Sequence, residues 1–112
     1  MEEDNMARKK FQTLTEQMYY ILLSLMKECC GVDIAQEVKE MTEGEVVIGP
    51  GTLYTLLGDF EKEGLIKATK QEGRKKSYLI TEKGKEMLQA EYERLRKQVN
   101  RGKTFLEEGR FI

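Results

Sequence analysis

The feature that most constrains the fold of this chain is a change in hydrophobic periodicity after residue 64. Up to that point apolar residues recur at spacings of three and four, which is the period of one helix face. Beyond it, two short segments alternate apolar and polar residues around a glycine-containing loop, which predicts a β-hairpin. Helical spacing then returns. The order predicts a mostly α-helical protein with a small β-hairpin: a winged helix-turn-helix with additional N-terminal and C-terminal dimerisation helices.

The first two helices are predicted from their caps and apolar stripes. Thr13 followed by Glu16 resembles a capping box, so the first helix is expected to begin there. Gly31 is expected to end it, which places two adjacent cysteines at its C-terminal end. The second helix is expected to start near residues 32 and 33 and to end before Gly44. The positions expected to be buried are Met18, Ile21, Leu22, Leu25 and Met26 in the first helix, and Ile34, Ala35, Val38 and Met41 in the second.

The third helix has the clearest start. A brief extended segment at residues 45–48 leads into Gly49 and Pro50, and proline suits the first helical position because its φ is already fixed. The helix is expected to run to about Glu63, with Gly64 as its C-terminal stop. Strands at residues 65–70 and 76–81 follow, joined by a loop at 71–75. Buried side chains are expected at Leu53, Leu56, Leu57 and Phe60 on the helix, and at Ile66, Ala68, Tyr78 and Ile80 on the hairpin.

The last helix carries a candidate dimer interface. Thr81 is expected to cap it, and Gly102 is expected to break or weaken it. Apolar residues step by four, three and four along it, the spacing of a coiled-coil seam. Two heptads are too few for a lone coiled coil, so the seam needs further packing. We therefore expect an N-terminal arm at residues 1–13, a DNA-binding domain at 14–81 and a dimerisation helix with its tail at 82–112, with a seam of Leu88, Tyr92, Leu95 and Val99.

The composition argues against catalysis, metal binding and membrane insertion. The chain has 112 residues, the size of one domain, and contains no histidine, the commonest general base and metal ligand. No nucleophile–base set appears, so no enzyme activity, cofactor or metal is expected. No run reaches the roughly 18 apolar residues of a membrane span, and the acidic start lacks the features of a signal peptide. A cytoplasmic protein is expected.

The two cysteines, Cys29 and Cys30, are adjacent. On a helix, neighbouring side chains point about 100° apart, so a disulfide between them would be strained. Zinc needs more ligands than one subunit offers. Reduced thiols are the expected state, and a redox-sensing role is the alternative.

Charge is distributed very unevenly although the net charge is only −1. Residues 11–64 hold 3 basic and 10 acidic residues, a net charge of −7. Residues 65–80 hold 5 basic residues and 1 acidic residue, a net charge of +4. A positive hairpin beside a negative body suits contact with DNA phosphates, while a solvated lysine-rich turn is the alternative. The basic residues are Lys67, Lys70, Arg74, Lys75 and Lys76, of which Arg74 is the strongest single candidate.

The start of the third helix is the second candidate surface. The amide groups of Gly51 and Thr52 suit a phosphate at a helix N-terminus. The side chains of Thr52, Tyr54 and Thr55 are long enough to contact the DNA backbone or the bases. Packing of Tyr54 against the second helix is the alternative for that residue. Because the second half of the helix is acidic, it is expected to tilt away from DNA. The candidate DNA-binding residues are Gly51, Thr52, Tyr54, Thr55, Lys70, Arg74, Lys75 and Lys76.

Three motifs in order resemble those of the PadR family, the phenolic-acid-decarboxylase repressor type. Residues 49–54 read G-P-G-T-L-Y, residues 60–66 read F-E-K-E-G-L-I, and residues 73–84 read G-R-K-K-S-Y-L-I-T-E-K-G. The similarity covers residues 14–88, and the length resembles that of the family's short branch. This chain departs from the family pattern in the middle of the third helix. Relatives often carry basic residues there, whereas this chain has Thr55, Gly58 and Asp59.

The resemblance implies repression of transcription by a homodimer bound to double-stranded DNA. It also implies that the C-terminal helix packs with the partner's N-terminal helix. Some relatives bind flat aromatic effectors at the dimer centre through a tryptophan; this chain has none, which leaves Tyr92 and Leu95 as the candidate ligand-binding residues. A winged helix used for protein contact is the alternative function, favoured by the acidic body.

Overall fold

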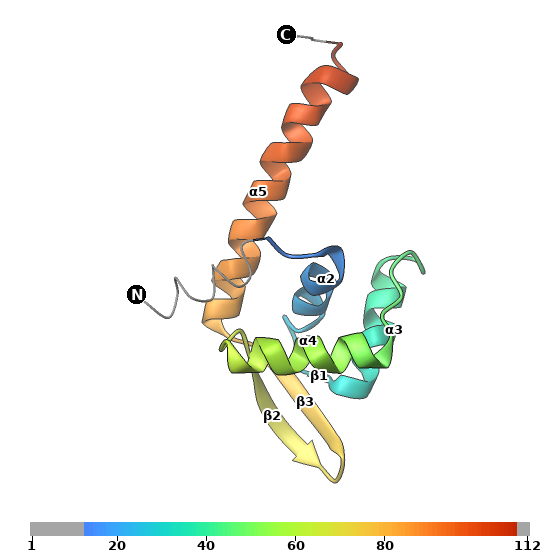
Figure 1. Cartoon of the computed structure of the whole chain (residues 1–112), viewed down its shortest axis with the longest axis vertical. Coiled ribbons are helices and arrows are strands. Elements are labelled where there is room, and N and C mark those ends of the chain that lie inside the picture. Colours follow the sequence, from blue (N-terminus) through green and yellow to red (C-terminus); the bar gives the residue numbers. More distant parts are fainter. Residues whose placement is uncertain (1–12, 110–112) are drawn as a thin grey trace.

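The computed structural model describes residues 13–109. Within them, the helices α2 (Glu16–Ser24), α3 (Gly31–Met41) and α4 (Pro50–Lys62) pack together beside a small sheet of β1 (Cys29–Cys30), β2 (Ile66–Glu72) and β3 (Lys75–Ile80). The long helix α5 (Glu82–Leu106) rises away from this body, and the β2–β3 hairpin projects from the opposite end (Figure 1). The predicted winged helix-turn-helix with a long C-terminal helix is confirmed. The arm predicted at residues 1–13 lies almost entirely outside the described residues.

Helix α2 begins at a different threonine from the one that the sequence indicated. The hydroxyl of Thr15 accepts a hydrogen bond from the N–H of Met18 at 3.2 Å, so Thr15 is the cap. The predicted cap at Thr13 is wrong because the following residue, Leu14, already donates its N–H to Glu91 on α5. Thr13 therefore belongs to the segment that leads into the helix. Ile21, Leu22 and Leu25 are buried as expected, whereas Met26 is 52% exposed.

The cysteines lie in a strand and not at a helix end. Helix α2 stops at Ser24, and Cys29 and Cys30 pair with Tyr78 and Ser77 of β3. The prediction of one helix up to residue 31 is wrong because local spacing carries no sign of pairing with a strand far along the chain. Adjacent strand residues point to opposite faces, so Cys29 is buried and Cys30 is only partly covered. Both are free thiols.

Helix α3 has the predicted extent to within two residues. It begins at Gly31 and buries Ile34 and Val38 on its inner face. Ala35 is partly buried, but Met41 is 44% exposed and was wrongly expected in the core, because it is the last residue of the helix and faces outward. The loop that follows has no regular structure, although Val46 and Ile48 within it are buried.

Helix α4 matches its prediction closely. Gly49 is the cap, Pro50 is the first helical residue, and Leu53, Leu57 and Phe60 are buried. Gly64 ends the helix with a φ of +77°, a left-handed conformation that glycine adopts without a Cβ penalty. The N–H of Leu65 then donates to the carbonyl of Phe60 at 2.8 Å, and that of Gly64 donates to Glu61 at 3.1 Å. These two bonds form a Schellman motif, which turns the chain into the hairpin.

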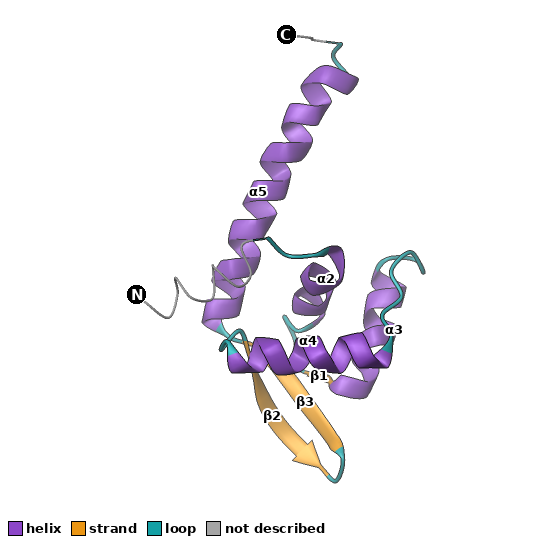
Figure 2. Ribbon diagram, viewed as in Figure 1, coloured by secondary structure: helices purple, strands orange, loops and turns teal. Residues whose placement is uncertain are grey.

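The hairpin of β2 and β3, here called the wing, has a tighter turn than predicted (Figure 2). Gly73 and Arg74 alone connect the strands, because Glu72 and Lys75 are already paired and Gly73 supplies a φ of +61°. The predicted five-residue loop is therefore wrong. The predicted register is correct, with Ile66 opposite Ile80 and Ala68 opposite Tyr78. Ala68, however, is exposed although Tyr78 opposite it is buried, since β2 is an edge strand of the sheet and β3 is the central strand.

Helix α5 starts at a crowded junction. The hydroxyl of Thr81 accepts from the N–H of Gly84 at 3.1 Å, as predicted for a cap, and donates to the carbonyl of Gly64 at 2.6 Å. A Cβ on Gly84 would lie 2.1 Å from the carbonyl oxygen of Leu65, so only glycine fits. The helix continues through Gly102 to Leu106, and the predicted break is wrong. One glycine costs a helix about 1 kcal/mol, which a long helix tolerates.

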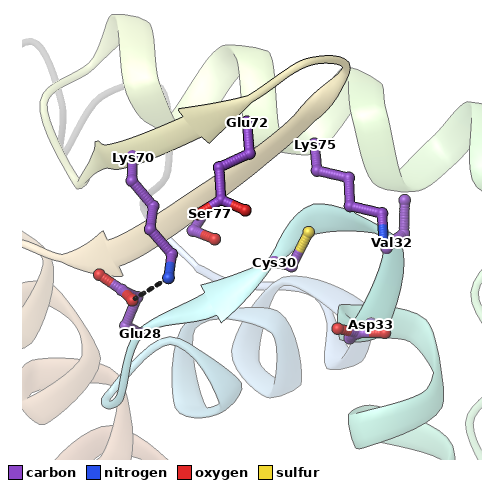
Figure 3. A pocket seen from close by; sticks show the side chains of 8 residues that line it. All are labelled: Glu28, Cys30, Val32, Asp33, Lys70, Glu72, Lys75 and Ser77. Atoms are coloured by element: carbon purple, nitrogen blue, oxygen red, sulfur yellow. Dashed lines mark ion pairs between the residues drawn. The ribbon is translucent and has the colours of Figure 1, made fainter.

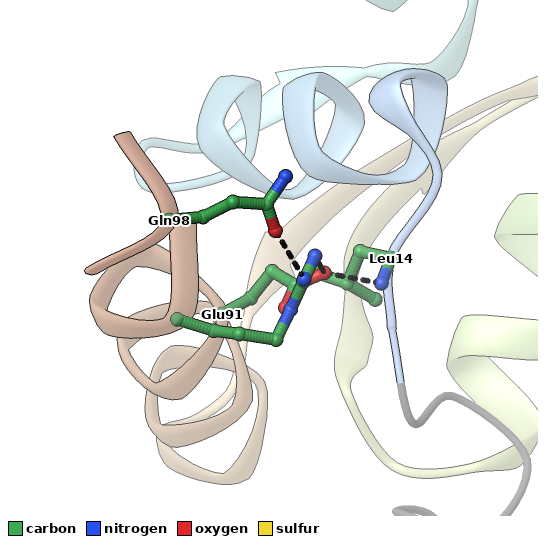
Figure 4. Close-up of polar contacts among 4 residues, drawn as sticks. Leu14, Glu91 and Gln98 are labelled. Carbon is green, nitrogen blue, oxygen red and sulfur yellow. Dashed lines mark hydrogen bonds and ion pairs between the residues drawn. The ribbon is translucent and has the colours of Figure 1, made fainter. Parts of the chain in front are cut away.

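A buried carboxylate ties the start of the described chain to α5. Glu91 is 5% exposed and accepts hydrogen bonds from the N–H of Leu14 and from Nε of Arg94, each at 2.5 Å. Arg94 also donates to the side-chain oxygen of Gln98 at 3.1 Å (Figure 4). The hydrogen bond from Arg94, and then that from Leu14, outweighs burial and lowers the pKa of Glu91. This network fixes α2 against the lower half of α5.

Candidate DNA-binding surface

The wing has two faces that carry different charges and contact different parts of the molecule. Residue pairs that lie opposite each other in an antiparallel ladder share a face. One face carries Lys70 opposite Ser77, and Ser77 is in turn opposite Cys30 of β1. We call this the cysteine face. The other, which we call the helix face, carries Lys76 opposite Gln71 and meets the end of α4.

A bulge in β2 gathers three lysines on the cysteine face. The register shifts between Ala68 and Lys70, so Thr69 is an extra residue in the strand. Residues three apart in a regular strand point to opposite faces, but the bulge brings Lys67 and Lys70 to the same face. Lys75, opposite Glu72, lies there too. The strip formed by Lys67, Lys70 and Lys75 is exposed throughout.

An open cavity of about 330 Å³ lies between this strip and the start of α3 (Figure 3). Nζ of Lys70 lies 3.8 Å from a carboxylate oxygen of Glu28, the residue before β1. The cavity contains three carboxylates and two ammonium groups, so it has no single sign of charge that would select an ion. Its lining residues are Glu28, Cys30, Val32, Asp33, Lys70, Glu72, Lys75 and Ser77.

The buried cysteine, Cys29, lies on the other face of β1 from Cys30 and is poorly suited to redox chemistry. Burial first, and then the carboxylates of Glu37 and Asp33, raises the pKa of the Cys29 thiol. A raised pKa disfavours the thiolate, which is the reactive form. The expectation of reduced thiols therefore has a physical basis at Cys29. Within residues 13–109, no three or more His, Cys, Asp or Glu side chains are placed so that they could hold one metal ion.

Lys76 is engaged with its own chain on the helix face. Its Nζ donates to Oε1 of Glu61 in the last turn of α4 at 3.2 Å and lies 5.4 Å from the ring centroid of Tyr78. Burial raises the pKa of Tyr78, an effect that the nearby ammonium opposes. Glu61 was not among the candidate site residues, since nothing in the local sequence pairs it with a strand residue fifteen positions later.

Arg74 occupies the tip of the wing, in the two-residue turn, and is exposed. Lys75 follows it at the start of β3 and is exposed as well. The four predicted wing cations are thus divided: Arg74 is at the tip, Lys70 and Lys75 are on the cysteine face, and Lys76 is on the helix face. The structure does not bring them into a single patch.

The start of α4 presents the predicted polar groups to solvent. Gly51, Thr52 and Thr55 are all exposed, and the first-turn amides have no partner within the helix. Tyr54 is 49% exposed, and an atom of its ring lies 3.5 Å from where a Cβ on Gly31 would be. Tyr54 therefore rests one edge on the start of α3 and leaves the rest accessible. Packing against the second helix is therefore confirmed in part, and DNA contact by the accessible part of the ring stays a prediction.

The predicted seam on α5 divides in two along the helix. Leu88 is buried within the subunit, and Leu95 is partly buried. Tyr92 is exposed and lines an apolar groove of about 360 Å³ between α2 and α5. Val99 is 69% exposed, and residues 96–101 are all accessible to solvent. The groove is lined by Tyr19, Leu23, Met26, Lys85, Leu88, Gln89 and Tyr92.

Together these features define a class of protein. Two successive helices, the second with a polar exposed start, and a lysine-bearing hairpin form a winged helix-turn-helix, the architecture of many DNA-binding domains. The family of PadR-like transcriptional regulators matches residues 21–90 of the chain. The chain therefore belongs to the PadR-like family and is a DNA-binding transcription regulator, not an enzyme.

Solved structures of bacterial regulators are similar to this chain. A transcriptional regulator from Clostridium thermocellum superposes with a TM-score of 0.70 at 26% identity, covering 80% of this chain and 91% of its own. A PadR family regulator from Clostridium difficile gives a TM-score of 0.66 at 27% identity, covering 80% and 97%. Bacillus subtilis PadR, solved in complex with operator DNA, gives 0.58 at 30% identity, covering 70% of this chain and 47% of its own. A comparison with curated proteins finds no match.

In the described part of the chain, no helix has the length and apolar character to span a membrane.

Proposed function

We propose that this protein is a homodimeric repressor that binds a pseudo-palindromic operator in the cytoplasm. The observation that carries the proposal is that exposed cations and an exposed helix start lie on two elements that contact each other, the wing and α4 (Figure 1). In this arrangement α4 enters the major groove, and the wing contacts the phosphate backbone or the adjacent minor groove. The operator complex of Bacillus subtilis PadR supports DNA as the partner.

Each element has a separate role in this proposal. The start of α4, with Gly51, Thr52, Tyr54 and Thr55, supplies backbone amides and side chains for phosphate and base contacts. Arg74 at the tip and Lys70 and Lys75 on the cysteine face contact phosphates. The carboxylates of Glu28 and Glu72 beside these lysines moderate their charge. The wing therefore supplies affinity, and the start of α4 supplies discrimination between sequences.

Dimerisation is proposed to use α5 and the groove beside α2. The seam residues Tyr92, Leu95 and Val99 offer apolar surface at heptad spacing, and Leu88 forms the base of the groove from within the subunit. A two-fold axis through this region would place the two α4 helices for half-sites one helical turn apart, about 34 Å. An aromatic effector bound at the dimer centre would contact Tyr92 and Leu95, in the absence of a tryptophan.

DNA binding can be tested by fluorescence anisotropy with a duplex that the protein selects from a random pool, measured at several salt concentrations. If three wing cations in each subunit contact phosphates, about six counterions are released, and log K falls against log salt with a slope near −5. Binding without salt dependence, or no binding, would contradict the proposal. In the second case, capture of another protein by the acidic surface of α3 would favour the protein-contact alternative.

A further inference from the structure

The recognition helix α4 and the wing are joined by an ion pair that the strand register does not require. Oε1 of Glu61 accepts a hydrogen bond from Nζ of Lys76 at 3.2 Å, and each side chain is 37% exposed. The same ammonium group lies 5.4 Å from the ring centroid of Tyr78. Lys76 is therefore held between a carboxylate of α4 and an aromatic ring of its own strand. Its position differs from that of Lys75 and Arg74, which are exposed and have no ion pair with α4 among the described contacts.

Other contacts hold the wing at its base, in the plane of the sheet and on the cysteine face, where Nζ of Lys70 lies 3.8 Å from a carboxylate oxygen of Glu28. Thr81 fixes the base through hydrogen bonds to the carbonyls of Gly64 at 2.6 Å and Leu65 at 3.0 Å. Strand β1 pairs with β3 at Cys30 and Ser77, within the sheet. A two-stranded hairpin has little stability of its own in water, so its outer part needs support from neighbouring elements. Across the helix face, the pair between Glu61 and Lys76 supplies that support.

We propose that Glu61 is a positioning residue that sets the angle of the wing against α4, and that Lys76 acts through this pair and not through a DNA phosphate. The inference rests on the proposed function, in which α4 and the wing contact the operator together. A wing already held at the correct angle has less freedom to lose when it binds its operator. The affinity for non-specific DNA depends on total positive charge and not on the angle between the wing and α4.

The test compares the operator selected by the wild-type protein with a scrambled duplex of the same length and composition. Glu61→Gln removes a negative charge, which by charge alone would raise affinity for both duplexes. Positioning predicts instead that the ratio of operator affinity to scrambled affinity falls about threefold to fivefold, the range expected for a partly exposed ion pair. Lys76→Gln should lower the ratio similarly. Its salt slope should stay at the wild-type value, whereas loss of one phosphate contact in each subunit would reduce the slope by about 2.

An exchange of charges separates positioning from direct DNA contact. The double variant Glu61→Lys/Lys76→Glu can re-form the pair, so the affinity ratio should recover towards that of the wild type. If Lys76 contacted a phosphate, a glutamate there would repel the DNA and prevent recovery. Glu72→Gln is the matched control, because it removes a wing carboxylate outside the pair. It should raise affinity for both duplexes equally and leave their ratio unchanged.

Two results would overturn this inference alone: an unchanged ratio in Glu61→Gln, or a salt slope reduced by about 2 in Lys76→Gln. Thermal unfolding curves for every variant exclude loss of folding as the cause of a lower ratio. Wild-type protein that binds neither duplex would overturn the proposed function, and this inference with it.

Discussion

The wing and the upper half of α5 are both exposed, but for opposite physical reasons. The wing exposes lysines and an arginine, whose charged groups are well hydrated in an isolated subunit. From residue 96 onward α5 exposes apolar side chains, notably Val99 and Leu106, at seam spacing. Hydrated cations are stable without a partner, whereas burying exposed apolar surface against a partner lowers the free energy. The wing thus needs no partner to be stable within one subunit, whereas the exposed apolar face of α5 is the surface proposed for contact with a second subunit.

The two regions also differ in how they are held. Hydrogen bonds at the base, a third strand and an ion pair to α4 fix the wing. The lower part of α5 is fixed at Gly84 and Glu91, and its upper part extends clear of the body (Figure 1). The junction at Thr81 and Gly84 therefore connects the wing, proposed for contact with DNA, to α5, proposed for contact with a second subunit. Substitutions on either side of it should separate the two roles.

The largest expected effect is at the junction between the two regions. Gly84→Ala would place a Cβ 2.1 Å from the carbonyl oxygen of Leu65 and 2.7 Å from Cγ1 of Ile80. Because backbone must move to relieve the clash, we expect a loss of about 3 kcal/mol in the free energy of unfolding, measured by urea denaturation at fixed protein concentration. Gly102→Ala is the control: nothing lies within 4 Å of its Cβ, and helix propensity predicts a gain of up to about 1 kcal/mol. Equal effects of the two substitutions would contradict the role of Gly84.

The next effect concerns α5 alone. Val99→Asp puts a charge on the proposed seam, where it would have to be buried between subunits. We expect a monomer by analytical ultracentrifugation and a loss of operator affinity of about a hundredfold, since the two half-sites are no longer engaged together. Lys97→Gln, at an exposed position on the opposite side of the helix, should leave the dimer intact. A dimeric Val99→Asp protein would place the interface elsewhere.

A somewhat smaller effect is expected at the network that ties α2 to α5. The pKa of Glu91 is lowered by Arg94 and by the N–H of Leu14, so its contribution to stability is fully present above the pKa of the unfolded chain. That contribution is lost as pH falls through the lower pKa of the folded state. Glu91→Gln should cost about 2 kcal/mol at pH 7, the value of hydrogen bonds to a charged group. The difference from wild type should shrink below about pH 4, and a constant difference in urea denaturation would argue against a charged Glu91.

How far the sequence could predict the structure depends on whether a feature is made by residues close together in the chain or far apart. Gly64, Thr81 and the stripe on α4 act on residues a few positions away, so their roles follow from spacing and were predicted correctly. The β1 strand and the pair between Glu61 and Lys76 join distant segments, and no local pattern records them. The bulge at Thr69, which aligns the lysine strip, is likewise visible only in the ladder. The charge of the site was therefore predictable, but its division between two faces was not.

The smallest of these effects isolates the wing from α5. Arg74→Ala removes one exposed cation from the tip of each subunit and leaves the register of β2 and β3 unchanged, since Arg74 lies in the turn. If Arg74 contacts phosphate, affinity should fall about tenfold for operator and scrambled duplexes alike, and the salt slope should decrease by about 2. Lys103→Ala, near the far end of α5, removes the same charge without affecting either value. A fall in operator affinity alone would instead indicate that Arg74 reads sequence or shape in the minor groove. No change in either affinity would show that the tip does not reach DNA, and the contacts would then have to come from the lysine strip on the cysteine face.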